Sequence, residues 1–201
     1  MRYLCKLDNV SVMDLNEDLQ RASDTVMRGK VILYPTDTVW GIGCDATDSD
    51  AVSRVYAIKR RSDSKAMLLL VDSIDTVKRY FPHVTADAES LLLDSERPTT
   101  VILPGACGIA PGLIAADGSV GVRVTRERYS RELCRMAGVP LVSTSANISG
   151  EPTAKCFAEI STEIKRAADY VCEAIRDDCS PGTPSRIVKL NSDNTITVIR
   201  P

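Results

Sequence analysis

Short aliphatic runs alternate with amphipathic helical segments along most of this chain, and that alternation is the strongest constraint on its fold. Residues 30–34 form a predicted buried strand that ends just before a proline. Ahead of it, residues 14–28 repeat apolar side chains on one helical face, with capping-box spacing at Asp14 and Glu17 and a stop at Gly29. The same patterns predict strands over 67–71, 99–103, 120–124 and 140–142, and helices over 49–58, 73–80, 85–94, 127–137 and 154–168.

Two β-rich stretches, 186–190 and 195–199, close the chain and are joined by Asn-Ser-Asp-Asn, which predicts a hairpin. Alternating strands and helices followed by a hairpin predict an α/β (α+β) fold with a mixed sheet. No Pro/Gly/Ser-rich linker divides the 201 residues, so we expect a single domain over 1–201. Aromatic residues supply only 4% of the chain, so the core must be aliphatic.

The composition excludes several classes of protein. A formal net charge of -2 argues against a uniformly basic nucleic-acid-binding surface, although a local basic groove depends on where charges sit. The longest apolar run, 66–71, is far too short to cross a bilayer, and the N-terminus has no apolar signal segment. Seven scattered cysteines without a C-x-x-C pair, beside the single His83, disfavour zinc and favour reduced thiols. We therefore expect a soluble, cytoplasmic protein with no membrane partner.

Common catalytic signatures are also missing from the sequence. It contains neither the G-x-x-x-x-G-K-[ST] of a P-loop nor the G-x-S-x-G of a nucleophile elbow. Gly41-Ile-Gly43 begins a dinucleotide-binding fingerprint, but Ala46 stands where the third glycine belongs, so a tight turn is the simpler interpretation. One histidine leaves a Ser-His-Asp hydrolase with a single candidate base.

The most distinctive segment is Tyr-Pro-Thr-Asp-Thr-Val-Trp-Gly-Ile-Gly-Cys-Asp-Ala, residues 34–46. It presents Thr36, Asp37 and Thr38 directly after a buried strand, and strand ends are where open α/β sheets bind ligands. Hydroxyls beside glycine-exposed backbone amides suit an anionic or zwitterionic ligand. The alternative is a β-turn in which these side chains satisfy local backbone groups, and the residues alone leave both hypotheses open.

Basic and hydroxyl-bearing segments offer further candidates, each with two interpretations. Residues 59–65 carry four cations and form either a solvated helix end or a phosphate clamp. Residues 143–150 form either an ordinary Ser/Thr-rich loop or a ligand-facing loop after a strand. Arg123 lies within a β-rich stretch and needs an anionic partner if it points inward, which strand alternation alone does not decide.

Taken in order, these segments resemble the YrdC family of threonylcarbamoyl-AMP synthases. The resemblance spans residues 30–200, almost the whole chain. Its motifs are the Tyr-Pro-Thr-Asp-Thr-Val-Trp-Gly segment, Lys59-x-Arg61, Pro98-Thr-Thr-Val-Ile-Leu, Gly121-Val-Arg-Val, Ser145-x-Asn147 and Ser185.

The resemblance implies a twisted mixed sheet flanked by helices, with a basic concave face. It implies that L-threonine, bicarbonate and ATP form threonylcarbamoyl-adenylate and pyrophosphate, for threonylcarbamoyladenosine modification of tRNA. Mg²⁺ is expected to accompany ATP, and the implied partners are a weakly bound tRNA and the proteins that transfer the threonylcarbamoyl group to tRNA.

The resemblance also assigns roles to residues. Because the reaction needs alignment and charge neutralisation, no nucleophilic side chain is expected. L-threonine is assigned to Thr36, Thr38, Arg123, Ser143 and Ser185, and ATP to Lys59, Arg61, Lys65, Ser145, Asn147 and Arg200.

The chain departs from the family pattern mainly around the threonine pocket. Ser62 and Ala66-Met67 replace family prolines, Leu68-Leu69-Leu70 lacks a family histidine, and Trp40 replaces tyrosine or phenylalanine. Two alternatives remain. A non-catalytic RNA-binding module using the same concavity is disfavoured by the charge and the few aromatics. A carbamoyl-adenylate enzyme of metallocofactor maturation would be expected to carry additional domains.

Overall fold

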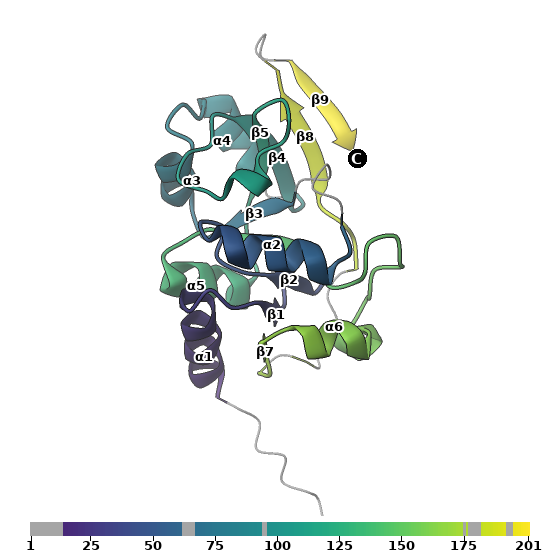
Figure 1. Cartoon of the computed structure of the whole chain (residues 1–201). Helices are drawn as coiled ribbons and strands as arrows, with labels where there is room; N and C mark the ends of the chain where they lie inside the picture. The colour runs from purple at the N-terminus through teal and green to yellow at the C-terminus, as the bar shows by residue number, and fades with distance from the viewer. Residues whose placement is uncertain (1–13, 62–66, 94–95, 175, 177–181, 192–194) are drawn as a thin grey trace, which may run out of the picture.

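The computed structural model describes residues 14–61, 67–93, 96–174, 176, 182–191 and 195–201, and its strands join in one nine-stranded sheet. The strand order is β7-β1-β2-β6-β3-β5-β4-β8-β9 (Figure 1). The pairs β1–β7, β3–β5 and β4–β8 are parallel and the others are antiparallel, which confirms the predicted mixed sheet. The strands are β1 (Ile32–Tyr34), β2 (Gly41–Gly43), β3 (Leu68–Val71), β4 (Thr99–Pro104), β5 (Ser119–Val124), β6 (Leu141–Ser145), β7 (Tyr170–Val171), β8 (Arg186–Leu190) and β9 (Ile196–Arg200).

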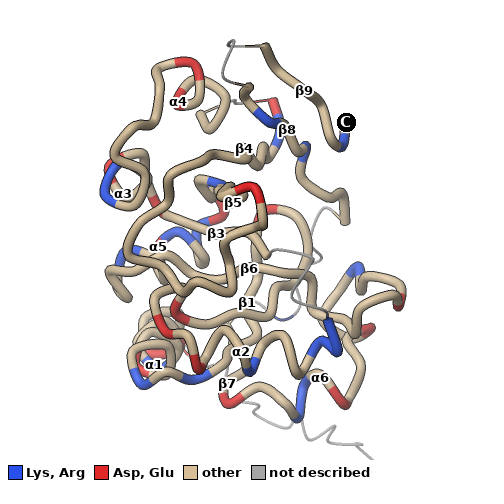
Figure 2. Tube along the Cα trace, turned by 45° about the horizontal axis from the view of Figure 1, so that its top comes forward, with Lys and Arg blue, Asp and Glu red and all other residues tan. Residues whose placement is uncertain are grey.

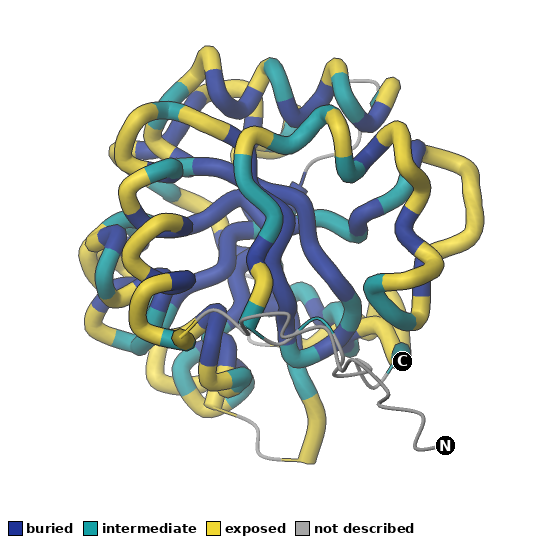
Figure 3. Tube along the Cα trace, turned by 90° about the horizontal axis from the view of Figure 1, so that it is seen from below, coloured by how far each residue is buried: buried dark blue, intermediate teal, exposed yellow. Residues whose placement is uncertain are grey.

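The helices surround this sheet, and its central strands are buried between the outer elements (Figure 3). The first helix packs against the fifth, and the third packs against β3 and β5. Acidic and basic residues occur together on the first, third and sixth helices (Figure 2). The helices are α1 (Leu15–Met27), α2 (Ser49–Ile58), α3 (Ile74–Tyr80), α4 (Ala86–Leu92), α5 (Arg128–Ala137) and α6 (Thr162–Ala167), with short 3-10 turns at Pro111–Leu113 and Phe157–Glu159.

The predicted helix over 154–168 is wrong. Its place is taken by an irregular segment, the 3-10 turn Phe157–Glu159 and the short helix α6. Ser161 has an extended backbone, and its hydroxyl accepts a hydrogen bond from the Ile164 amide at 3.3 Å, so it starts a new helix within the predicted one. The segment does carry apolar residues at helical spacing, but the capping residue Ser161 prevents one continuous helix.

The sequence patterns also missed two strands, β2 and β7. Gly41-Ile-Gly43, expected to be a tight turn, is instead a strand between β1 and β6. β7 has two residues, which is too short for an alternating pattern to reveal. The remaining predicted elements match the structure apart from small differences at their ends.

The first helix shows which capping interactions the chain uses. Asp14 caps α1 by accepting a hydrogen bond from the Asn16 amide at 3.2 Å. Glu17 does not complete the capping box, because its carboxylate pairs with Arg21 one turn later at 2.6 Å. Gly29 follows the helix at a φ of 69°, a left-handed conformation that favours glycine.

A buried carboxylate fastens α1 to the segment after β7. Asp18 is completely buried and accepts hydrogen bonds from the Tyr170 hydroxyl at 2.5 Å and from the amides of Glu173 and Ala174, both at 2.9 Å. These donors come from residues more than 150 positions away in sequence. The carboxylate therefore links the start of the chain to the edge of the sheet.

We expect Asp18→Ala to lower the free energy of unfolding by about 2–4 kcal/mol, because it leaves three partly buried donors without their acceptor. Tyr170→Phe removes one of the three donors and should cost about 1 kcal/mol. Urea denaturation followed by circular dichroism measures both. Equal stability of Asp18→Ala and the wild type would contradict this role.

Within the residues that the structure describes, no helix combines the length and apolar character needed to span a membrane.

Candidate functional site

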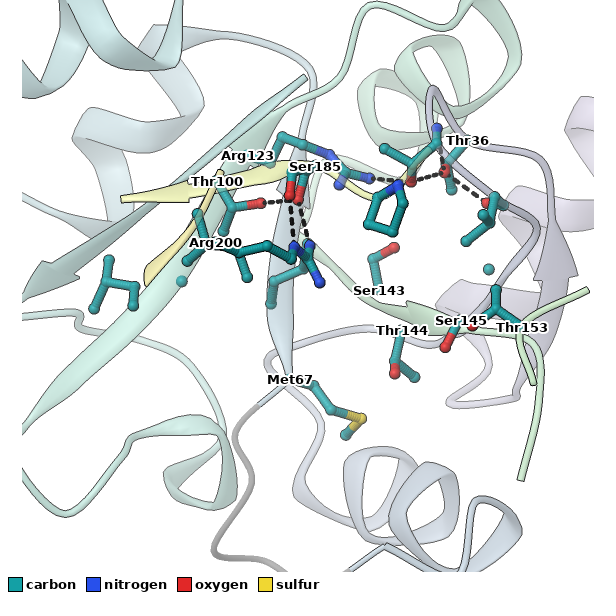
Figure 4. A pocket seen from close by; sticks show the side chains of 18 of the residues that line it. Thr36, Met67, Thr100, Arg123, Ser143, Thr144, Ser145, Thr153, Ser185 and Arg200 are labelled. Atoms are coloured by element: carbon teal, nitrogen blue, oxygen red, sulfur yellow. Dashed lines mark hydrogen bonds between the residues drawn. The ribbon is translucent and has the colours of Figure 1, made fainter. Parts of the chain in front are cut away.

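A cavity of about 380 Å³ opens on one face of the sheet, and it gathers most of the residues singled out from the sequence (Figure 4). On β4 and β5 alternate residues form its wall, while hydrophobic residues between them point into the core. On β5, for example, Ser119, Gly121 and Arg123 line the cavity, whereas Val120 and Val122 are buried in the hydrophobic core. Arg123 therefore points inward. The cavity crosses the sheet face and is not confined to strand ends, because this face carries many small residues.

The cavity is cationic. Arg61, Arg123 and Arg200 line it, and none of the described residues in its wall is acidic. Burial lowers the pKa of each guanidinium, and for Arg200 repulsion by Arg123 adds to that effect. Three partly dehydrated cations around one cavity favour an anionic ligand.

Arg123 is held by a buried carboxylate from the loop after β1. It is only 3% exposed, and its Nη2 lies 3.0 Å from Oδ1 of Asp37. The same Nη2 donates to the Thr38 hydroxyl at 3.4 Å. The Asp37 contact is electrostatic and not a well-aligned hydrogen bond, and Arg123 Nε has no hydrogen-bond partner among the described residues. Asp37 thus supplies a counter-ion behind Arg123, although Asp37 itself does not line the cavity.

Residues 34–46 contain the local turn that one hypothesis expected, and this turn lies at the cavity. The Thr36 hydroxyl donates to the Val39 carbonyl at 2.7 Å and accepts from the Thr38 amide at 3.2 Å, as in a local turn. The hydroxyls of Thr36 and Thr38 also lie 3.1 Å apart, and both residues line the cavity. The turn therefore fixes the positions of two residues that line the cavity.

On the opposite wall, three residues from β4, the segment before β8 and the end of β9 form a hydrogen-bonded group. The Thr100 and Ser185 hydroxyls are 2.9 Å apart. Arg200 donates through Nε to the Ser185 carbonyl at 2.8 Å and through Nη2 to its hydroxyl at 3.1 Å. Figure 4 shows this group beside Arg123 and Ser143. Arg200, which the resemblance assigned to ATP, thus contacts a residue assigned to threonine.

The basic segment after α2 divides into residues with different surroundings. Arg61 lines the cavity, whereas Arg60 is exposed and pairs with Glu163 at 2.6 Å. Lys59 is only 1% exposed and does not line the cavity, so it is not part of a solvated helix end. Lys65 lies outside the described residues.

The segment 143–150 begins as strand and continues as a loop. Ser143 and Ser145 belong to β6 and line the cavity together with Thr144. Asn147 does not line it. Its side-chain amide instead donates to the carbonyls of Ile148 and Glu151, at 3.1 and 2.7 Å.

Some cavity residues were not assigned from the sequence. Thr100 lies within the Pro98-Thr-Thr-Val-Ile-Leu motif, and period-two alternation along β4 could have found it, since Thr100 and Ile102 face the cavity while Val101 is buried. Thr153 also lines the cavity, and it lies just before the segment 154–168 that was wrongly predicted to be a helix. Trp40 does not line the cavity but packs on Phe157, with ring centroids 5.0 Å apart.

Comparison with known proteins relates this arrangement to one family. The sequence profile of the Sua5_yciO_yrdC family, described as telomere recombination, matches residues 24–201. Threonylcarbamoyl-AMP synthase of Xanthomonas campestris pv. campestris is 35% identical over 173 residues, or 84% of this chain and 92% of that protein. A putative threonylcarbamoyl-AMP synthase of Methanocaldococcus jannaschii is 32% identical over 196 residues, or 94% of this chain and 90% of that protein.

Among solved structures, P. abyssi Sua5 complexed with L-threonine has a TM-score of 0.84 at 20% sequence identity. That match covers 94% of this chain and 55% of the Sua5 chain. The chain therefore spans nearly all of the two sequence relatives and about half of this structural neighbour.

Proposed function

This chain belongs to the Sua5/YciO/YrdC family, and we propose that it is an L-threonylcarbamoyladenylate synthase, a nucleotidyltransferase. It converts L-threonine, bicarbonate and ATP into threonylcarbamoyl-AMP and pyrophosphate, for threonylcarbamoyladenosine modification of tRNA. The observation that carries this proposal is the hydroxyl-rich cavity with three arginines and no acidic residue in its described wall. The names of the sequence relatives support the enzyme over a non-catalytic RNA-binding module.

We propose that the amino acid occupies the part of the cavity around Arg123. A guanidinium there suits the threonine carboxylate, and the hydroxyls of Thr36, Thr38, Ser143 and Ser185 suit its polar groups. The triphosphate then lies toward Arg61 and Ser145. Leu68, from the stretch without the family histidine, supplies an apolar part of the wall.

The proposed chemistry depends on alignment. Bicarbonate takes up a proton and releases water to give carbon dioxide. The threonine amine adds to this carbon dioxide and loses a proton to become a carbamate. A carbamate oxygen then attacks the α-phosphorus, and the bond to the leaving pyrophosphate breaks. Arginines neutralise the phosphate charge, and the hydroxyls orient both substrates, so no covalent enzyme intermediate is required.

We propose that Mg²⁺ enters with ATP as part of the substrate. The described wall offers hydroxyl and carbonyl oxygens but no carboxylate, which fits a cation held largely by phosphates and water. We further propose a reducing, cytoplasmic setting, which the free thiols of Cys44, Cys107, Cys134, Cys156 and Cys172 support. Transient contact with tRNA and with threonylcarbamoyl-transfer proteins follows from the use of the product.

The direct test incubates the purified protein with ATP, L-threonine, bicarbonate and Mg²⁺ and detects threonylcarbamoyl-AMP by mass spectrometry. We expect product and pyrophosphate in equal amounts, and neither without L-threonine. Arg60→Met is the matched control for Arg61→Met, because Arg60 is exposed and outside the cavity. Absence of product under conditions where the X. campestris synthase is active would reject the proposal.

ATP affinity should depend on pH through Lys59. Burial, and secondarily the Arg61 cation, lowers the pKa of Lys59 to about 8. Its ammonium binds the carbonyls of Ser145 and Asn147, so ATP held at Ser145 favours the protonated amine and raises this pKa. Below pH 8 the amine is protonated with and without ATP, so it adds no pH dependence. Above pH 8 ATP binding must take up a proton, so affinity falls as pH rises.

We expect the Kd for MgATP to rise about tenfold from roughly pH 7.5 to pH 9.5. Isothermal titration calorimetry measures both this change and the proton uptake. Arg60→Met should keep the wild-type profile, whereas Lys59→Met should bind more weakly with no dependence on pH in this range. An unchanged slope in Lys59→Met would assign the titration to another group.

A further inference from the structure

Lys59 makes three connections to the end of β6 and the loop that follows it, residues 145–151. Its Nζ donates to the carbonyl oxygens of Ser145 at 2.5 Å and Asn147 at 2.7 Å. Its own backbone carbonyl accepts from the Ser149 amide at 2.9 Å. These partners are 86 to 88 positions away for the side-chain bonds, so the contacts join two distant parts of the chain.

The charge of Lys59 is thus directed away from the cavity. The carbonyl oxygens of Ser145 and Asn147 bind its ammonium group, and no carboxylate pairs with it in the described structure. Asn147 holds the far side of the same loop through the Glu151 carbonyl. By contrast, Arg61 and Ser145, the other residues of the two short motifs, both line the cavity.

We propose that Lys59 and Asn147 are positioning residues, which fix the loop so that the Ser145 hydroxyl faces the nucleotide beside Arg61. Each motif then contributes one residue that contacts the ligand and one that holds the loop. This division rests on the proposed nucleotide-binding function of the cavity. It differs from an assignment in which Lys59 itself contacts a phosphate.

Hydrogen exchange of the ligand-free protein distinguishes the two roles. In the wild type the amides of Ala146 and Ser149 are bonded to the carbonyls of Trp40 and Lys59. We expect Lys59→Met to speed exchange in residues 145–151 about tenfold or more, because the loop loses two charge-assisted bonds. Asn147→Ala should also speed exchange in residues 145–151, because it removes the side-chain hydrogen bonds to the carbonyls of Ile148 and Glu151.

Ser145→Ala is the matched control, because it keeps the carbonyl that Lys59 binds and removes only the hydroxyl. We expect wild-type exchange in this variant but a raised KM for ATP. Lys59→Met should raise the same KM, and the double variant Lys59→Met/Ser145→Ala should be little worse than either single variant. Additive losses would indicate that Lys59 contacts ATP independently.

Hydrogen exchange of the amides in β4, residues 99–104, serves as the reference for global unfolding. Equal acceleration there, or a Lys59→Met protein that does not fold, would show a general stability role and overturn the proposal. Unchanged exchange in 145–151 together with weaker ATP binding would also overturn it. Because exchange is measured without ligand, it remains informative even if the synthase assay fails.

Discussion

Replacing Gly43 by alanine is expected to cost about 3–5 kcal/mol of folding free energy, a large loss for the addition of one methyl group. A Cβ at this position would lie 1.8 Å from the carbonyl oxygen of Val142 and 3.0 Å from its carbonyl carbon. Both are backbone atoms of the neighbouring strand β6, so no side-chain rotation relieves the clash. The variant must instead separate β2 from β6 in the middle of the sheet.

Gly41→Ala is the matched control, two residues earlier on the same strand. Its Cβ would approach the Thr36 methyl at 3.2 Å and the Ser143 hydroxyl at 3.5 Å, which are side-chain atoms that face the cavity. We expect a stability change of about 1 kcal/mol or less, but weaker binding of L-threonine. Urea denaturation and ligand titration separate the two effects. A Gly43→Ala protein as stable as Gly41→Ala would contradict the close approach of the strands.

The same pair of glycines shows what sequence patterns convey about this fold. Alternation of aliphatic strands and amphipathic helices predicted the mixed sheet, because burial imposes those periods along the chain. Gly41-Ile-Gly43 carries no such period, and Gly43 is explained by an adjacent strand roughly a hundred residues later in sequence. Close approach between distant segments leaves no local pattern, so β2 could not be distinguished from a turn.

The candidate site, like the fold, could be predicted only in part from the sequence. Resemblance to a family assigned roles to eight of the residues that line the cavity, but it did not distinguish them from assigned residues that lie outside it. Lys59 and Asn147 lie in the expected motifs, yet they face backbone carbonyls of the 145–151 segment and not the cavity. Orientation depends on the loop that each residue meets in the folded protein, which neither charge nor spacing specifies.

Arg123 is the residue for which stability and function are most closely combined. It is buried beside Asp37, and it also lines the cavity. Arg123→Met should therefore have two effects. It should lower the free energy of unfolding by about 3–5 kcal/mol, because Asp37 becomes an uncompensated buried charge. It should also reduce kcat/KM for L-threonine about a hundredfold or more, because the substrate carboxylate loses its partner.

The double variant Asp37→Asn/Arg123→Met separates these effects. Removing both charges should restore stability to within about 2 kcal/mol of the wild type, since a buried ion pair and a neutral pair of similar size often differ little. Activity should stay as low as in Arg123→Met, because Asp37 acts on the guanidinium and not on the substrate. Urea denaturation and the threonylcarbamoyl-AMP assay measure the two quantities on the same proteins. Recovery of activity in the double variant would mean that Arg123 serves the fold alone and that another cation binds the carboxylate.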